Sequence, residues 1–243
     1  MINENTNKVA IVTGGSRGIG LEIAKGLALD GFSIAIIARS QETLDEALKQ
    51  VQSQSTTSRS NHTAYALDVS DFQEVHNTVD KIHKHYGRID LLVNCAGMYI
   101  AGTLNVTVQE FEQGLRVNLL GPFAFMQAVL PIMKSQKTGY IMNIASRGGK
   151  IGFAGDGAYG AGKFGLVGLS ESLYRELADD NIKLTTLCPS WTNTDMAQEA
   201  KTPFSDSDMI QPSDILETIR WLLRLAPSTC IREIIIECKK AIH

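Results

Sequence analysis

The sequence KVAIVTGGSRGIG, residues 8–20, decides the fold class of this chain. Its first six residues are an apolar run of strand length, and the glycine-rich segment after them opens a helical stretch, Gly18–Leu29. Gly14 permits a tight turn, Gly18 lets the backbone approach a pyrophosphate, and Gly20 allows close packing of helix on strand. The free N–H groups at the start of such a helix bind phosphate well. The stretch therefore predicts a strand, a phosphate-binding turn and a helix.

On either side of this pattern, short apolar runs alternate with longer helical stretches. The predicted strands are Lys8–Thr13, Ser33–Ala38, His62–Leu67, Asp90–Asn94, Tyr140–Ile144, Lys183–Leu187 and Glu233–Glu237. The predicted helices are Gly18–Leu29, Glu42–Gln52, Asp71–Tyr86, Thr107–Lys134, Gly157–Ala178 and Ser213–Leu225. Strands that are apolar on both faces are typical of a parallel sheet covered by helices on each side. We predict an α/β fold, a single-domain Rossmann-like doubly wound sheet of about seven mostly parallel strands with helices on both faces.

We expect residues 1–243 to form one domain, because no repeat or low-complexity segment interrupts the alternation. The polar stretch Ser53–Asn61 is expected to be a solvated loop, and the aperiodic segment 190–212 a substrate loop. A net charge of −3 gives no electrostatic reason to expect nucleic acid or an anionic membrane as a partner. No apolar run approaches the ~20 residues that span a bilayer, and the polar start Met1–Lys8 has no signal-peptide pattern.

The cysteines and histidines predict neither disulfides nor a metal site. No C-x-x-C pair occurs, and Cys95 and Cys188 end apolar runs, where a buried thiol behaves as a small hydrophobe. His83 and His85 are two residues apart on a predicted helix, so they face different sides and make a poor metal pair. Free thiols without a secretory signal indicate a cytoplasmic protein.

The end of the second predicted strand indicates which dinucleotide binds. A carboxylate at this place would accept a hydrogen bond from the 2′-hydroxyl of NAD. Here Ala38 stands where the acid would be, and Arg39 and Ser40 follow it. Arg39 and Arg17 of the glycine turn offer two cations to the same point. We therefore predict NADP(H); the alternative is that both arginines are only solubilising surface residues.

Tyr159 and Lys163 form a Y-x-x-x-K pair near the start of a predicted helix. The spacing of four puts both side chains on one face, about one turn apart. A nearby ammonium stabilises the phenolate and lowers the pKa of tyrosine from its usual value of about 10. The pair then donates a proton to a carbonyl oxygen as hydride arrives, or accepts one in reverse. Taken alone, such a pair is usually an ordinary helix surface, so its weight comes from the motifs around it.

Those motifs, in their order along the chain, resemble the short-chain dehydrogenase/reductase family in its short single-domain form. Ser146 lies 13 residues before Tyr159 and directly after a predicted strand. The other matching positions are Asp68-Val69, Asn94-Cys95-Ala96-Gly97, Asn118, and Pro189 with Thr194. The resemblance covers nearly the whole chain.

The resemblance implies four catalytic residues and a set of cofactor contacts. Tyr159 would be the acid/base, Lys163 would lower its pKa and bond the nicotinamide ribose, and Ser146 would hold the substrate oxygen. Asn118 would fix a water that links Lys163 to solvent, and Asp68 would bond the adenine amino group. The residues expected to bind NADP(H) are Gly14, Ser16, Arg17, Gly18, Ile19, Gly20, Arg39, Ser40, Asp68, Val69, Asn94, Ala96, Gly97, Tyr159, Lys163, Pro189, Thr192 and Thr194.

Three departures from the family's pattern carry expectations of their own. Cys95 stands where asparagine is usual, which removes a side-chain amide that ties strands together. Ser190 replaces the usual glycine after Pro189 and is expected to tighten the backbone beside the nicotinamide. The run Glu233–Lys240 lacks the Asp-Gly-Gly ending of many members, which puts an assembly interface in question.

Substrate specificity is expected in segments 98–102, 148–153 and 190–212. Apolar side chains there suit a medium-sized hydrophobic carbonyl or alcohol: Met98, Tyr99, Ile151, Phe153, Trp191, Met196 and Phe204. The alternative activity is that of a 3-oxoacyl-[acyl-carrier-protein] reductase. Asp179 and Asp180, at the end of the helix that carries the tyrosine, would repel an acidic carrier at the mouth of the site. A non-catalytic NADP(H)-binding sensor is less favoured, because all four catalytic positions are kept.

The long helices 107–134 and 157–178 are predicted to form a subunit interface. Each is apolar on more than one side, and such a helix must be covered on more than one side. The resemblance implies that these two helices pair across a twofold axis. We expect a homo-oligomer, a homotetramer rather than a dimer; the alternative is a monomer with scattered exposed apolar residues.

Overall fold

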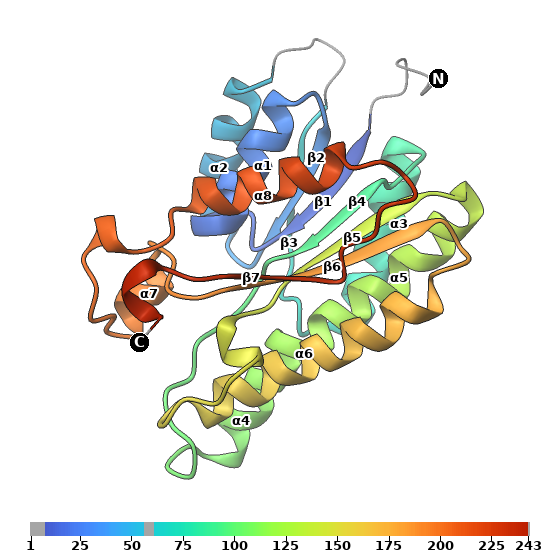
Figure 1. Cartoon of the computed structure of the whole chain (residues 1–243). Coiled ribbons are helices and arrows are strands. Elements are labelled where there is room, and N and C mark those ends of the chain that lie inside the picture. Colours follow the sequence, from blue (N-terminus) through green and yellow to red (C-terminus); the bar gives the residue numbers. More distant parts are fainter. Residues whose placement is uncertain (1–7, 56–60, 243) are drawn as a thin grey trace.

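The computed structural model describes residues 8–55 and 61–242 of the chain (Figure 1). The polar start before residue 8 and residues 56–60 of the expected loop Ser53–Asn61 lie outside the described residues. The strands are β1 (Val9–Thr13), β2 (Ser33–Ala38), β3 (Thr63–Ala66), β4 (Leu91–Asn94), β5 (Gly139–Ile144), β6 (Ile182–Pro189) and β7 (Glu233–Ile236). The α-helices are α1 (Gly18–Leu29), α2 (Gln41–Ser53), α3 (Phe72–Tyr86), α4 (Val108–Leu115), α5 (Gly121–Gln136), α6 (Gly157–Glu176), α7 (Asp195–Glu199) and α8 (Pro212–Arg224). Shorter turns are the π-helical η1 (Arg116–Leu120) and the 3₁₀ turns η2 (Arg147–Gly149), η3 (Asp206–Asp208) and η4 (Lys239–Ala241).

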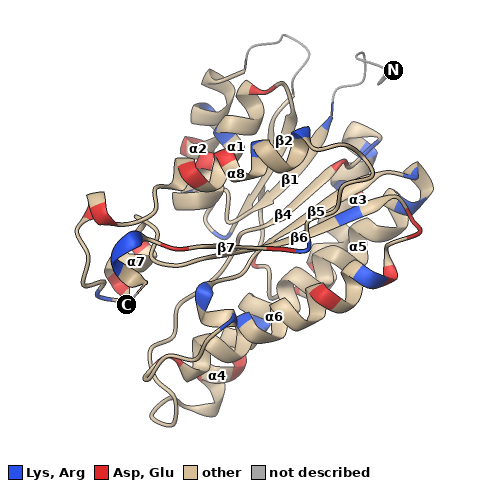
Figure 2. Ribbon diagram, in the orientation of Figure 1, with Lys and Arg blue, Asp and Glu red and all other residues tan. Residues whose placement is uncertain are grey.

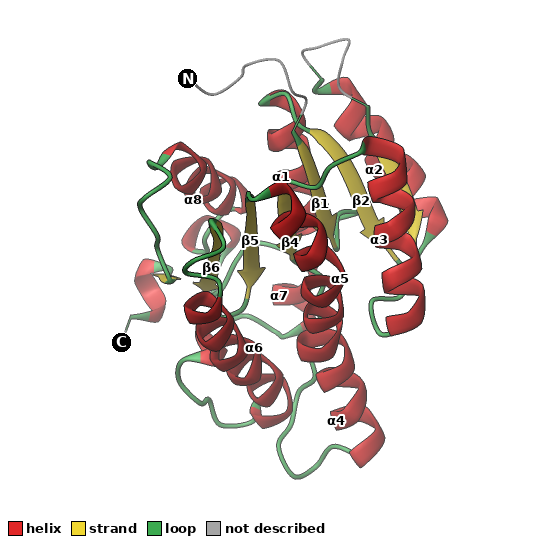
Figure 3. Ribbon diagram, turned by 90° about the vertical axis from the view of Figure 1, so that its right-hand side faces the viewer, coloured by secondary structure: helices red, strands yellow, loops and turns green. Residues whose placement is uncertain are grey.

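The strands of the described residues form one parallel seven-stranded sheet, in the order β3-β2-β1-β4-β5-β6-β7. Helices α1, α2 and α8 cover one face, and α3, α5 and α6 cover the other (Figures 1 and 3). The predicted α/β class with a doubly wound, Rossmann-like sheet is confirmed. Between β1 and β4 the strand order reverses direction, and such a switch point leaves a crevice beyond the carboxyl ends of the strands.

The turn between β1 and α1 depends on glycine at two positions. Gly14 has a φ of +66°, a left-handed conformation that other residues rarely adopt, and a Cβ there would lie 2.9 Å from the Ala96 backbone. A Cβ on Gly20 would lie 2.2 Å from the carbonyl oxygen of Gly14. No side chain caps the start of α1 at Arg17, so the first N–H groups of this helix are left for a ligand.

The expected helix Thr107–Lys134 divides into α4, the π-helical turn η1 and α5. Together they form a continuous stretch, Val108–Gln136, which by length and composition alone could cross a membrane. This differs from the expectation that no stretch is apolar enough. In the fold, Phe125, Val129 and Met133 are fully buried in the core beside the sheet, so packing accounts for their apolar character.

Side chains tie β1, β4 and β5 together at their carboxyl ends. The Thr13 hydroxyl accepts hydrogen bonds from the backbone N–H groups of Cys95 and Ala96, both at 3.0 Å. The Asn94 amide donates to Asn143 Oδ1 at 2.8 Å. Thr13 and Asn94 therefore link the strands by hydrogen bonds, although Cys95 stands where a second asparagine amide is usual.

Segment 190–212, the expected substrate loop, follows β6 and contains α7, η3 and a bridge between Thr192 and Ile210. The residues after β7 end beside α7 (Figure 1). Ser190 joins these two segments: its N–H donates to the Ile236 carbonyl at 2.8 Å, and its hydroxyl accepts from the Cys238 N–H at 2.8 Å. The serine that replaces glycine is thus a tie between β6 and the end of the described chain.

Candidate active site

The expected catalytic residues meet at the carboxyl edge of the sheet. Ser146 follows β5, and its side chain lies close to Tyr159 in one cavity, where both flank Gly148. Tyr159 lies in the first turn of α6, and Lys163 lies one turn further along. Gly148 donates its N–H to Ser146 Oγ at 3.0 Å, which orients the serine side chain.

Lys163 is a buried cation in the same cavity, only 4% exposed. Its Nζ donates to the Ile144 carbonyl oxygen at 3.0 Å and lies 5.7 Å from the centre of the Tyr159 ring. Burial lowers the pKa of Lys163 to about 8, because desolvation disfavours the charged form. This lysine is therefore close to its titration range near neutral pH.

The pKa of Tyr159 is raised to about 12, the opposite of the direction that the sequence predicts. Burial is the main cause, because it disfavours the phenolate, and the hydrogen bond with Ser146 only partly offsets it. The Asp156 carboxylate raises the pKa further. Lys163 is bonded to the Ile144 carbonyl, and its charge does not reverse the effect of burial. A phenol in this environment keeps its proton at neutral pH.

Asp156, which the sequence analysis did not single out, places a carboxylate in the same cavity. The Tyr99 hydroxyl donates to Asp156 Oδ1 at 2.7 Å, and the Tyr99 ring lies 5.5 Å from the Tyr159 ring at 60° to it. Asp156 is the residue before α6 and precedes Tyr159 by three positions. That helical spacing was a signal that the sequence held, since residues three apart lie on one face.

Asn118 lies in the π-helical turn η1 and is buried. The Met98 N–H donates to Asn118 Oδ1 at 3.1 Å, and Asn118 Nδ2 donates to the Met98 carbonyl at 2.9 Å. The amide therefore holds the residues that follow β4. A Cβ on Gly97 would lie 3.2 Å from Asn118 Oδ1 and 3.6 Å from Lys163 Nζ, so the asparagine and the lysine flank the same glycine.

A second cavity adjoins the first, and the two share Ile19, Cys95, Gly97, Thr194 and Met196 as lining residues. Most residues expected to bind the cofactor line this second cavity: Gly14, Ser16, Arg17, Gly18, Ile19, Gly20, Arg39, Ser40, Asp68, Val69, Ala96, Gly97 and Thr194. Pro189 and Thr192 line the first cavity with Tyr159 and Lys163. Asn94 lines neither, because its side chain is buried between strands.

The second cavity is lined by a cation after β2 and by a carboxylate after β3. Ala38 ends β2 without a carboxylate, and Arg39 lies beside it. Burial of Asp68 acts to raise the pKa of its carboxyl. Hydrogen bonds from Ser70, at 2.9 Å from N–H and 2.7 Å from the hydroxyl, outweigh that effect together with the nearby Arg39, so the pKa lies below its usual value. The carboxylate is therefore ionised and able to accept from an amino group.

Arg17 is paired with acids of the substrate loop. Its Nη1 lies 3.3 Å from Asp195 Oδ2 and 3.8 Å from Glu199 Oε1, and all three side chains are exposed. A Cβ on Gly18 would lie 3.2 Å from Thr194 Cγ2, so the glycine turn and the loop are in contact at this point. Arg17 therefore lines the second cavity and also links the glycine turn to the substrate loop.

Only some of the side chains that the sequence suggests for substrate contact line the first cavity. Those that line the first cavity are Tyr99, Phe153, Trp191 and Met196. Met98 lines the second cavity, Phe204 packs against the Trp191 ring at 6.4 Å, and Ile151 is exposed. Arg147, next to Ser146, also lines the first cavity and was missed, because nothing in its local sequence pattern distinguishes it from a surface arginine.

Comparisons with known proteins agree with this geometry. The family model described as short chain dehydrogenase matches residues 8–203. A human 3-oxoacyl-[acyl-carrier-protein] reductase is 36% identical over 196 residues, which are 80% of this chain and 80% of that protein. The crystal structure of a betaketoacyl-[ACP] reductase from Bacteroides thetaiotaomicron superposes with a TM-score of 0.87 at 43% identity, covering 98% of this chain and 99% of that one. A metagenomic short-chain oxidoreductase in complex with NADP superposes with a TM-score of 0.82 at 29% identity, covering 96% and 97% of the two chains.

The family match covers both cavities and all the strands up to β6. The relatives that share the fold over nearly the full length of the chain are oxidoreductases. The chain therefore belongs to the short-chain dehydrogenase family and is an oxidoreductase of alcohol and carbonyl groups.

Proposed function

We propose that this protein transfers hydride reversibly between NADP(H) and a ketone or aldehyde, or the corresponding secondary alcohol, with Tyr159 as the acid/base. The observation that carries the proposal is that Ser146, Tyr159 and Lys163 line one cavity, which adjoins the glycine-lined one. Two hydroxyl groups in one cavity suit a carbonyl oxygen, which accepts two hydrogen bonds. The nicotinamide, when bound, supplies or accepts the hydride.

In the reductive direction, Ser146 and Tyr159 would hold the carbonyl oxygen, and Tyr159 would give it a proton as the oxygen becomes an alcohol. A tyrosine whose pKa is raised to about 12 enters this step protonated. Lys163 would bond the ribose hydroxyls and stabilise the phenolate that forms, since its ammonium lies near the ring. Asn118 would position the Gly97 backbone between them through its two bonds to Met98.

The preference for NADP(H) rests on Arg39 and Arg17, together with the absence of an acid at Ala38. Arg39 lines the second cavity at the end of β2, where the adenosine ribose binds in such folds. Arg17 would exchange its exposed carboxylate partners for a phosphate. Exposed ion pairs are weak, so that exchange costs little.

A second candidate is a 3-oxoacyl-[acyl-carrier-protein] reductase, because the human and Bacteroides relatives carry that name. The repulsion of an acidic carrier that the sequence predicts does not arise within a single subunit. Asp179 and Asp180 follow the far end of α6, whose 20 residues span about 30 Å from the end that carries Tyr159. Asp180 is also paired with Lys134 at 2.7 Å. These acids therefore do not flank the mouth of the chain's own cavity.

The test is NADPH oxidation by the purified protein, measured against ketones, aldehydes, quinones and 3-oxoacyl thioesters, each free and on an acyl carrier protein. Turnover of a hydrophobic ketone supports the first candidate, and turnover of only carrier-bound thioesters supports the second. The Tyr159→Phe variant is the control for contaminating reductases. Equal rates in the variant and the wild type would show that the acid/base is misassigned.

We also propose that the protein is a homo-oligomer, a tetramer rather than a dimer, that pairs α5 and α6 with the same helices of a second copy. The apolar side chains Phe123 of α5 and Phe164 of α6 are 43% and 44% exposed, although both helices also pack inward. Exposed phenylalanines on adjacent long helices (Figure 3) need a cover. Light scattering after size exclusion would give a multiple of 26.5 kDa, and a monomer mass would refute the proposal.

A further inference from the structure

The segment 233–241, which comprises β7 and the residues after it, touches both walls of the substrate cavity. One wall, which we call the serine wall, is the stretch 146–153 that follows β5. The other, which we call the loop wall, is the substrate loop 190–212. We call segment 233–241 the brace. Figure 1 shows the end of the brace beside α7, on the same side of the sheet edge as the loop.

The brace holds the serine wall through two ion pairs. Arg147 Nε lies 2.7 Å from Glu237 Oε1, and Arg147 Nη1 donates to the Ala241 carbonyl at 2.5 Å. Lys150 Nζ lies 2.9 Å from Glu233 Oε2. The Arg147 and Glu233 side chains are only 19% and 16% exposed, so these pairs are poorly screened by water.

Arg147 is the residue next to Ser146, and its guanidinium also lies 5.5 Å from the centre of the Phe153 ring. Both Arg147 and Phe153 line the cavity. The contacts with Glu237 and Ala241 therefore fix the side chain that supports Phe153, and with it the start of the turn that carries Ser146.

The brace holds the loop wall through separate contacts. Ser190 is bonded to both Ile236 and Cys238, each at 2.8 Å. Lys240 Nζ lies 2.7 Å from Asp208 Oδ2, in the turn η3 of the loop. In Figure 2, ribbon segments coloured for basic residues (blue) and acidic residues (red) lie near α7 and the end of the described chain.

We infer that the brace is a positioning element that sets the distance between the two walls, and so determines which substrates fit between Ser146 and the loop. This inference rests on the proposed function only in taking the cavity as the place where a carbonyl binds. Loosening the brace widens the cavity, so a small substrate is held less closely between the two walls, while Ser146 and Tyr159 keep their places at the ends of β5 and α6.

The main test is Glu237→Gln, which keeps the shape of the side chain but removes the charge that faces Arg147. We expect KM for small ketones to rise about tenfold while kcat and the dissociation constant of NADPH stay within about twofold, since the cofactor cavity is untouched. Bulky ketones should lose less than small ones, so the selectivity between the two changes. The matched control is Glu171→Gln, which breaks the exposed pair with Arg232 at 3.1 Å outside the cavity and should leave all constants unchanged.

A double-mutant cycle tests whether the brace couples the walls. Lys150→Met releases the serine wall and Asp208→Asn releases the loop wall, and neither residue lines the cavity. Effects on kcat/KM that multiply independently would show two local contacts and overturn the inference; a combined effect that departs from the product by threefold or more supports it (about 0.6 kcal/mol).

Amide hydrogen exchange distinguishes failure of the brace from failure of the proposed function. If the wild type turns over no carbonyl compound, the proposed function fails, but Glu237→Gln should still speed exchange in both 146–153 and 190–212. Exchange that changes only around Arg147, or unchanged selectivity in an active enzyme, overturns the brace.

Discussion

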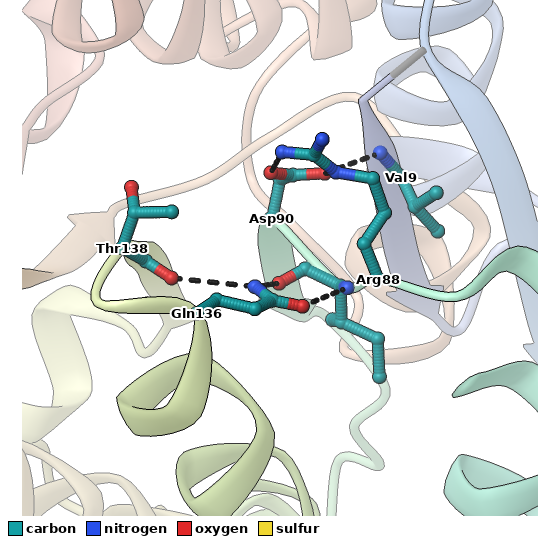
Figure 4. Close-up of polar contacts among 6 residues, drawn as sticks. Val9, Arg88, Asp90, Gln136 and Thr138 are labelled. Atoms are coloured by element: carbon teal, nitrogen blue, oxygen red, sulfur yellow. Dashed lines mark hydrogen bonds and ion pairs between the residues drawn. The ribbon is translucent and has the colours of Figure 1, made fainter. Parts of the chain in front are cut away.

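The two edges of the parallel sheet use polar side chains in opposite ways. At the amino edge, Asp90 accepts from the Val9 N–H at 2.8 Å and from Arg88 Nε at 2.8 Å, and Gln136 bonds both the N–H and the carbonyl of Ile89 (Figure 4). Each of these hydrogen-bond donors and acceptors has its partner within the protein. The hydrogen bonds there complete the starts of β1 and β4 and hold the end of α5 against them.

At the carboxyl edge, the protein environment moves the pKa values of titratable groups away from their usual values. The pKa of Tyr159 is raised to about 12 and that of Lys163 is lowered to about 8, both mainly by burial. Keeping the Lys163 ammonium at this edge costs stability, because its charged form is disfavoured by the loss of water. The comparison indicates that the amino edge contributes stability, while the carboxyl edge keeps polar groups available for a ligand.

The largest expected effect is at the carboxyl edge. Tyr159→Phe removes the transferable proton, and we expect kcat to fall by about 10²–10⁴-fold, the range for one acid/base. The free energy of unfolding should stay nearly the same, because the variant keeps the ring and its packing. Steady-state kinetics and urea titration give the two numbers. A clear loss of stability in this variant would contradict the division between the edges.

The corresponding substitution at the amino edge is Asp90→Ala. It leaves the Val9 N–H and the partly buried Arg88 without their acceptor, so we expect the free energy of unfolding to fall by about 2–4 kcal/mol. Below the unfolding transition, kcat should match the wild type. Lys81→Ala, which breaks an exposed pair with Glu74, is the control and should change neither. A fall in kcat at full folding would show that the two edges are coupled.

The next prediction concerns Arg39, a residue of the carboxyl edge that we propose selects NADPH over NADH. Arg39→Ala removes a charge-assisted contact of about 1.5–3 kcal/mol, so the dissociation constant of NADPH should rise by about 10–150-fold while that of NADH stays constant. Fluorescence titration of both cofactors measures this. Arg175→Ala, on the exposed face of α6, is the matched control. Parallel weakening of both cofactors would mean that Arg39 does not face the 2′-phosphate.

The smallest expected effect is a pH shift. Alcohol oxidation needs Tyr159 without its proton, and the pKa of about 12 means that kcat/KM should rise with pH across the alkaline range. Asp156 raises that pKa, so Asp156→Asn should lower it and move the profile to lower pH. Tyr99→Phe keeps the carboxylate and should leave the profile closer to that of the wild type. A shift of Asp156→Asn to higher pH would show that the carboxylate acts on another group.

The sequence predicts those parts of the fold that depend on local pattern. The bounds of α1 and β2 agree with the expected Gly18–Leu29 and Ser33–Ala38, because glycine placement and apolar periodicity determine them locally. The meeting of Ser146, Tyr159 and Lys163 also follows, since strand ends in a parallel sheet gather at one edge. Their assigned roles remain predictions.

What the sequence missed depends on tertiary contacts. The direction of the Tyr159 pKa is set by burial, which spacing along a helix does not reveal. The partners of Arg17, Asp195 and Glu199, are about 180 residues away in the chain. Asp179 and Asp180 were placed at the mouth of the cavity because they share a helix with Tyr159, but α6 is long enough to carry them to the opposite edge.

The π-helical turn η1 has a consequence for how this gene can change by insertion and deletion. A π turn holds one residue more than the α-helical path, and the extra residue bulges out while the helices on either side stay in phase. Deleting one of residues 116–120 would restore regular α-helical winding, so the change would fall on the side chains within the turn. Asn118 would then no longer face Met98, although no side chain in the core had been replaced. Length in this stretch is therefore under tighter constraint than residue identity, and a single-codon deletion there should be more damaging than most substitutions.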